Sequence, residues 1–130
     1  DASSIQAPGA TGTDHRLHIA MDLLSWQFVE VLVTDVHTGE TLKHFTLRRG
    51  DVAVADRGYA HCQGMSEAVK QGAELIVRLN PFSVVLSDAA GAPVELCVTL
   101  RRQKTETLRT LAVTLCAAGG QYEVRGWIHA

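Results

Sequence analysis

The chain has 130 residues, 46% of them hydrophobic, and a formal net charge of −2 at pH 7. This length fits one domain, or one and a part, and this composition can form a hydrophobic core. The mildly negative balance does not indicate a nucleic-acid binder, and no apolar run reaches the roughly 18 residues of a membrane span.

The ends and the cysteines indicate a cytoplasmic piece of something longer. Cys62, Cys97 and Cys116 form no C-x-x-C pair, which favours free thiols in a reducing compartment over a disulfide framework. No basic segment followed by an apolar one opens the chain, so we expect no signal peptide. Because the sequence opens on Asp1 without an initiating methionine, we expect it to be cut from a longer protein.

Residues 1–45 predict a loop, a hairpin and a short helical turn. Residues 1–14 are rich in Gly, Ser, Thr and Pro, as loops are. Alternation over residues 15–23 and 27–34 predicts two antiparallel strands with a turn between them. The first strand has an apolar face, Leu17, Ile19, Met21 and Leu23, and a polar face, Arg16, His18 and Asp22, which we expect to be solvated. Residues 40–45 predict the helical turn.

Residues 51–80 predict a strand, a helix and another strand. Residues 51–55 form a short apolar run that we expect to be buried. A helix is expected over residues 64–71, with Gly72 as the residue that stops it. The apolar run 74–79 follows, and Pro81 ends it. The order over residues 1–80 is therefore β-β-(short helix)-β-α-β.

The character of the chain changes after Pro81. Strand-like runs occupy residues 84–86, 94–100, 108–116 and 122–128, and none shows helical periodicity. We therefore expect two parts, residues 1–80 as an α/β core and residues 81–130 as the start of a β-rich insertion.

Asp56 is the first candidate for chemistry, because it ends the strand predicted over residues 51–55. Gly58 follows two residues later, so the backbone can turn sharply and let another group approach. In open α/β sheets ligands bind at the carboxyl ends of the strands. A carboxylate in that place is well set to hold a metal, and Asp1 is the candidate partner.

Five segments in order carry a family resemblance over residues 1–80. They are Asp1-Ala2-Ser3, Gly12-Thr13-Asp14-His15-Arg16-Leu17-His18, Thr34-Asp35-x-x-Thr38-Gly39-Glu40-Thr41, Arg49-Gly50-Asp51-x-x-x-Ala55-Asp56-Arg57-Gly58-Tyr59-Ala60 and Gly72-Ala73-x-x-Ile76-Val77-Arg78-Leu79-Asn80. This succession resembles the DDE transposases of bacterial insertion sequences, of the IS-four type. The resemblance implies an incomplete ribonuclease-H-like core with a mixed sheet, interrupted by a β-rich insertion.

The resemblance also implies cut-and-paste DNA transposition with Mg²⁺ or Mn²⁺ held by three acids. Asp1 and Asp56 match the first two, and the third, a glutamate after the insertion, has no match here. Carboxylates suit Mg²⁺, and a metal pair activates the nucleophile and stabilises the leaving oxygen. On adjacent strands about 4.8 Å apart both acids could reach one metal. The alternative is that Asp56 is a solvated strand-end acid and Asp1 a frayed terminus.

Five residues are candidates for DNA contact: Arg57, Tyr59, Arg101, Arg102 and Lys104. For Arg57 and Tyr59 the alternative is a surface arginine and a tyrosine at the edge of the core. For the basic run 101–104 it is a solvated loop. A zinc site at His61 and Cys62 is not expected, because no second ligand pair has suitable spacing.

Two functions remain open. The first is a piece of a transposase that binds DNA, in a parent that could be a homo-oligomer, the piece itself being inactive without the third acid. The second is a non-catalytic remnant that binds DNA or protein. If Asp1 ends the central strand of the sheet, that strand is missing, and we expect marginal stability from the exposed strand edges.

Overall fold

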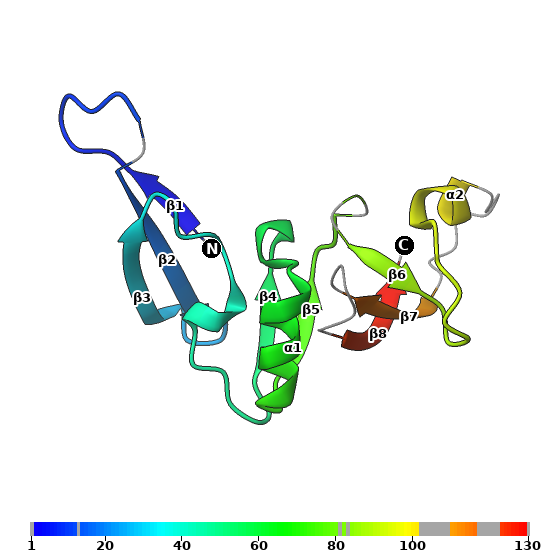
Figure 1. The fold of residues 1–130 in the computed structure, drawn as a ribbon. Helices are drawn as coiled ribbons and strands as arrows, with labels where there is room; N and C mark the ends of the chain where they lie inside the picture. The colour runs from blue at the N-terminus through cyan, green and yellow to red at the C-terminus, as the bar shows by residue number, and fades with distance from the viewer. Residues whose placement is uncertain are drawn as a thin grey trace.

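A computed structural model describes residues 2–12, 14–80, 82, 84–101, 110–116 and 123–129 (Figure 1). Over these residues the chain is a mixed α/β structure with three small sheets. The coarse fold class predicted from the sequence is therefore confirmed.

The first sheet has the strand order β1-β2-β3 and is antiparallel throughout. Its strands are β1 (Ala2–Ile5), β2 (His15–Asp22) and β3 (Gln27–Asp35). The β2–β3 hairpin was predicted, and its turn is fixed by Asp22, whose Oδ1 accepts hydrogen bonds from the backbone N–H groups of Leu24 (2.7 Å) and Ser25 (2.9 Å).

The strand β1 corrects two expectations. Residues 2–5 lie in the segment predicted as a loop, yet Ala2 pairs with His18 and Ile5 with His15. The four residues have little strand character of their own, so the ladder that β2 offers their backbone decides their conformation. The place beside β2 that was expected to be empty is therefore occupied by β1.

The two faces of β2 differ from the prediction at the middle of the strand. His18, expected on a solvated face, is fully buried. The loop after β3 covers that face, and the ring of His44 lies 4.7 Å from the ring of His18. On the other face, Val31 and Val33 of β3, which pair with Ile19 and Leu17, are more than half exposed.

The middle unit consists of two parallel strands with a helix across them (Figure 1). The strands are β4 (Val52–Ala55) and β5 (Glu74–Val77), and the helix is α1 (Cys62–Lys70). The 3₁₀ turn η1 (Leu42–His44) precedes β4, and the turn η2 (Arg57–Tyr59) joins β4 to α1. Gly72 follows α1 with φ of +89°, so the predicted glycine stop is confirmed.

The strand β4 is buried on one face only, where full burial was expected. Ala53 and Ala55 are half-buried on the α1 side, while Val52 and Val54 are 56% and 59% exposed. Ile76 of β5 is 61% exposed as well. Parallel sheets are usually covered on both faces, so this apolar face lacks a covering layer among the described residues.

The third sheet is antiparallel with the order β6-β7-β8. Its strands are β6 (Val85–Ser87), β7 (Thr110–Cys116) and β8 (Glu123–His129), each of which overlaps a predicted run. The run 94–100, predicted as a strand, instead contains the helix α2 (Leu96–Arg101). A short apolar run does not by itself distinguish the two, and here burial of Leu96 against the core accompanies the helix.

The core joins the middle unit to the third sheet. Met65 and Ala68 of α1 pack in one cluster with Leu115 of β7 and Val124 of β8. The thiol of Cys62 donates to the carbonyl oxygen of Leu115 at 3.3 Å. No helix of the described residues is long and apolar enough to cross a membrane.

Candidate functional site

Asp56 lies where the sequence placed it, directly after the last residue of β4. Its backbone is extended, with φ of −78° and ψ of 172°, and it begins the turn η2. The carbonyl oxygen of Asp56 accepts the N–H of Tyr59 at 3.0 Å. The Asp56 side chain does not cap a backbone N–H of the turn. It is 60% exposed, so a cation in solution can reach it.

Arg78 stands beside Asp56 because β4 and β5 run parallel and end at the same edge. The backbone N–H of Arg78 donates to the carbonyl oxygen of Ala55 at 3.0 Å, which extends the ladder by one residue. Its Nη1 lies 3.9 Å from Oδ1 of Asp56, and both side chains are mostly exposed. Such an exposed pair contributes little to stability, so both charges remain accessible at this edge.

Packing explains why the turn has glycine at position 58. A side chain at Gly58 would overlap the carboxylate of Glu40, whose Oε2 lies against the glycine α-carbon. Glu40 follows β3 in the chain, so the turn after β4 contacts a loop that leaves the first sheet. The flexibility argument from the sequence led to the same residue, but the group that approaches it is part of the chain itself.

Tyr59, a candidate DNA contact, is 2% exposed and belongs to the core cluster. Burial, together with the negative charge of Glu40, raises the pKa of Tyr59 to about 12. Its hydroxyl is buried with no hydrogen-bond partner in the structure, so Tyr59 is an unpaired polar group beneath the Asp56 turn.

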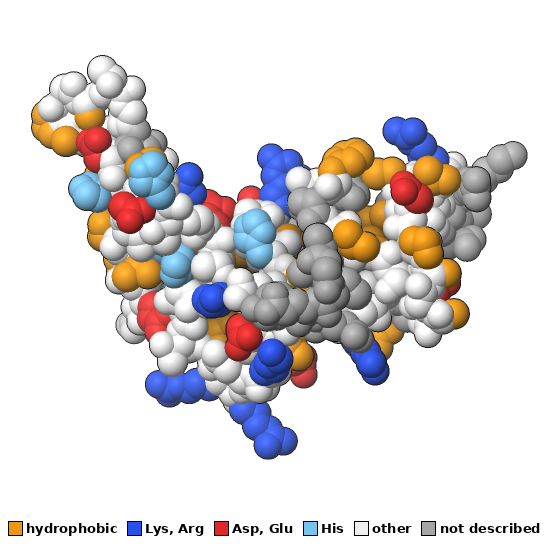
Figure 2. Space-filling view, in the orientation of Figure 1, with side chains coloured by type: hydrophobic (Ala, Val, Ile, Leu, Met, Phe, Trp, Pro, Cys, Tyr) orange, Lys and Arg blue, Asp and Glu red, His pale blue; other side chains and the backbone are white. Residues whose placement is uncertain are grey.

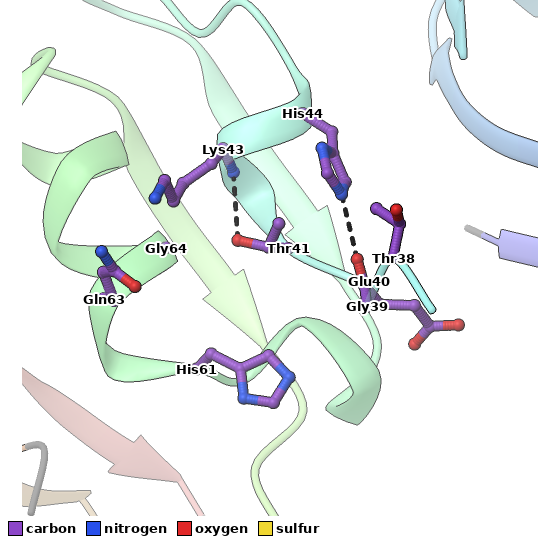
Figure 3. A pocket seen from close by; sticks show the side chains of 9 residues that line it. All are labelled: Thr38, Gly39, Glu40, Thr41, Lys43, His44, His61, Gln63 and Gly64. Atoms are coloured by element: carbon purple, nitrogen blue, oxygen red, sulfur yellow. Dashed lines mark hydrogen bonds between the residues drawn. The ribbon is translucent and has the colours of Figure 1, made fainter. Parts of the chain in front are cut away.

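A shallow hollow of about 520 Å³ opens beside this turn (Figure 3). Its walls come from the loop after β3 and from the start of α1, and the residues that line it are Thr38, Gly39, Glu40, Thr41, Lys43, His44, His61, Gln63 and Gly64. Nε2 of His44 donates to the carbonyl oxygen of Gly39 at 2.9 Å, which closes the loop on itself. Glu40 points away from Lys43 and Gln63 in this view.

His18 has one partnered and one unpartnered ring nitrogen. Nε2 of His18 lies 2.9 Å from Oγ1 of Thr34, and that hydroxyl lies 3.3 Å from the carbonyl oxygen of Asp35. Nδ1 is buried without a partner. Burial first, and the nearby His44 second, lower the pKa of His18.

We expect the stability of the chain to fall as the pH drops below about 6.5, the ordinary pKa of histidine. Unfolded His18 takes up a proton in that range, and the lowered pKa of the folded imidazole means that the folded state takes up less. The unfolded state then binds more protons, so the free energy of unfolding decreases with falling pH, by at most about 1.4 kcal/mol per pH unit for one proton. Urea denaturation between pH 7.5 and about 5 measures this slope.

The matched pair for this test is His18→Phe and His15→Phe. Both residues lie on β2, but His15 is exposed and His18 is not. His18→Phe should flatten the pH dependence, and His15→Phe should leave it unchanged. An unaltered slope in His18→Phe would assign the pH dependence to other groups.

The remaining predicted residues are not brought together. Asp1, Arg102 and Lys104 lie outside the described residues, while Arg57 and Arg101 are exposed. On the face in Figure 2, Lys and Arg side chains are scattered and gather in no single patch, and histidines lie over the first sheet and beside the middle unit. Among the described residues no three His, Cys, Asp or Glu side chains are grouped so as to hold a metal.

Sequence reasoning missed three residues of this region: His18 as a buried group, Glu40 and Arg78. A signal for them existed, because all three lie in the segments quoted for the family resemblance. The sequence did not reveal that Glu40 contacts the Asp56 turn, or that Arg78 follows the strand beside it.

Comparison with known proteins gives similarity to transposases of bacterial insertion sequences. Over 81 residues the chain is 31% identical to the putative transposase InsL for insertion sequence element IS186A of Escherichia coli K12, and equally to the transposase for insertion sequence element IS421 of Escherichia coli. These residues are 62% of this chain and 22% of each relative, so the chain spans about a fifth of the curated relatives it matches. No family model and no solved structure matches the chain.

Proposed function

We propose that this chain is part of a DNA transposase of an insertion sequence, of the DDE type, and that Asp56 is one of its metal-ligand acids. The observation that carries the proposal is the position of Asp56: exposed, at the carboxyl end of β4, beside the end of a parallel strand. The similarity to the two Escherichia coli transposases supports it. The chain would act on DNA in the cytoplasm.

The donor chemistry at Asp56 fits a divalent metal in part. Its carboxylate is a hard oxygen ligand with open access to solvent, and Mg²⁺ commonly keeps several waters beside one or two carboxylates. When bound, Mg²⁺ or Mn²⁺ would supply the activated nucleophile and the charge relief that phosphodiester cleavage needs. Asp1 is proposed as the second ligand, and the third acid has no match in this chain, so the 130 residues alone should not cleave DNA.

The arrangement of strands supports a ribonuclease-H-like core. The first sheet ends at β1 and the middle unit at β4, and each of these strands has one unpaired edge among the described residues. We propose that β1 and β4 pair in the longer protein, which gives one mixed sheet in the order β3-β2-β1-β4-β5. The uncovered apolar side chains of β3 and β4 then need a further layer of chain.

Metal binding at Asp56 is testable on the 130-residue chain. Titration with Mn²⁺, followed by broadening of backbone amide signals in nuclear magnetic resonance spectra, should affect residues 55–59 and Arg78 first. Asp56→Asn should remove this broadening, because an amide is a poor ligand for a hard cation.

The control is Asp51→Asn, at the opposite end of the same strand, where the carboxylate accepts the N–H of Arg48 at 2.7 Å. It should leave the broadening at Asp56 in place. Equal broadening at every exposed acid, or no effect of Asp56→Asn, would exclude Asp56 as a metal ligand and favour a non-catalytic DNA- or protein-binding remnant.

A further inference from the structure

The turn that carries Asp56 is held from the side by one acidic residue. Oε2 of Glu40 lies against the α-carbon of Gly58, so closely that a Cβ at this position would overlap it. The backbone of Gly58 is not in the left-handed region, so the glycine is needed for this contact and not for its φ angle. Two chain segments 18 residues apart, by their numbers, therefore meet at one carboxylate.

The same carboxylate acts on the neighbouring tyrosine. The Tyr59 hydroxyl is buried without a partner, and Glu40 is the charged group whose field reaches it. A buried hydroxyl without an acceptor is costly, and a carboxylate is the acceptor that would relieve this cost. In the structure Glu40 does not bond to this hydroxyl, so its contact with the turn is the one at Gly58.

Glu40 is itself anchored to the first sheet. Its loop is closed by the hydrogen bond from His44 to Gly39, and Thr41 caps η1 by accepting the N–H of Lys43 at 3.3 Å. The ring of His44 then packs on His18 of β2 (Figure 3 shows His44 and its bond to Gly39). The contact at Gly58 therefore connects the first sheet to the end of β4.

We propose that Glu40 is a positioning residue, whose carboxylate fixes the Asp56–Tyr59 turn relative to the first sheet. This inference rests on the proposed function of Asp56 as a metal ligand. Where β1 and β4 pair, the ladder aligns the two strands, but the Asp56 side chain is placed by the turn that follows β4. Asp1 and Asp56 can therefore share a metal only if that turn is held in place. Glu40 is the side chain that reaches from the first sheet's loop to the turn of the second acid.

Amide hydrogen exchange at neutral pH reports on the turn directly. The N–H groups of Tyr59 and Ala60 are bonded within it, to Asp56 at 3.0 Å and Arg57 at 3.2 Å. Glu40→Gln removes the charge and keeps the size, and Gly58→Ala displaces the carboxylate. Either change should speed exchange of both amides about tenfold, as local opening becomes easier. Exchange at Met65, which α1 protects, should stay unchanged.

The second measurement is Mn²⁺ broadening at Asp56. Glu40→Gln and Gly58→Ala should weaken it about tenfold, since a loosened turn must be ordered before it can bind. Glu40→Asp should restore part of the effect, because it keeps the charge. The matched control is Glu74→Gln, an exposed glutamate at the start of β5, which should change neither readout.

The outcomes separate this inference from the proposed function. Unchanged exchange at Tyr59 and Ala60 in both variants overturns the role of Glu40, whatever Asp56 binds. Faster exchange with unaltered Mn²⁺ binding at Asp56 also overturns it, because Glu40 would then support the fold and not the ligand. If the unaltered chain shows no Mn²⁺ binding that depends on Asp56, the proposed function fails, while the exchange result still decides whether Glu40 restrains the turn.

Discussion

In the longer transposase proposed above, Asp56→Ala is expected to slow DNA strand cleavage at least about a thousandfold, the factor that about 4 kcal/mol of lost transition-state stabilisation gives. The carboxylate would be removed from the carboxyl end of β4, where it is 60% exposed and is the proposed metal ligand. Asp1→Ala should have the same effect. DNA binding should be largely retained, because contacts with phosphate are made mainly by Arg and Lys.

Cleavage of element-end DNA in Mg²⁺, with binding measured separately by gel shift, tests this prediction. Asp51→Ala is the matched change on the same strand, and it should leave cleavage per bound complex nearly unaltered. If Asp56→Ala instead loses DNA binding and cleaves normally once bound, Asp56 is a binding residue and not a metal ligand.

Gly64→Val is expected to destabilise the chain by about 3 kcal/mol, a large part of a typical total of 5–15 kcal/mol. Gly64 is the point where α1 touches η1. A Cβ there would lie 2.7 Å from Oγ1 of Thr41 and 3.2 Å from the backbone nitrogen of Leu42. The valine must push the turn away and break the cap that Thr41 gives to the N–H of Lys43.

Urea denaturation compares this variant with Gly39→Val, where a Cβ would meet nothing within 4 Å. The control should shift the midpoint little. Equal stability of the two variants would mean that α1 and η1 do not pack tightly through Gly64, and that the hollow beside them has no fixed wall.

The sequence by itself determined the elements that local chemistry specifies. The hairpin follows from strict alternation. The helix α1 follows from its apolar spacing and from Gly72, because the backbone after the helix has φ of +89°, which glycine adopts without strain. The position of Asp56 at a strand end also followed, because an apolar run, an acid and a glycine two residues later form a local pattern. Each of these features depends on residues that are near neighbours in the chain.

Only the tertiary structure decided which side of each element is covered. His18 is buried and Val33 exposed because the loop after β3 packs on one face of β2, and alternation cannot tell which face a distant loop will cover. Tyr59 lies in the core because residues distant in the chain pack around it. The strand at Ala2–Ile5 and the helix at Leu96–Arg101 depend on partners far along the chain, a ladder with β2 and burial of Leu96 against the core. The contact of Glu40 with Gly58 exists only once two sheets are folded, so no local pattern could predict it.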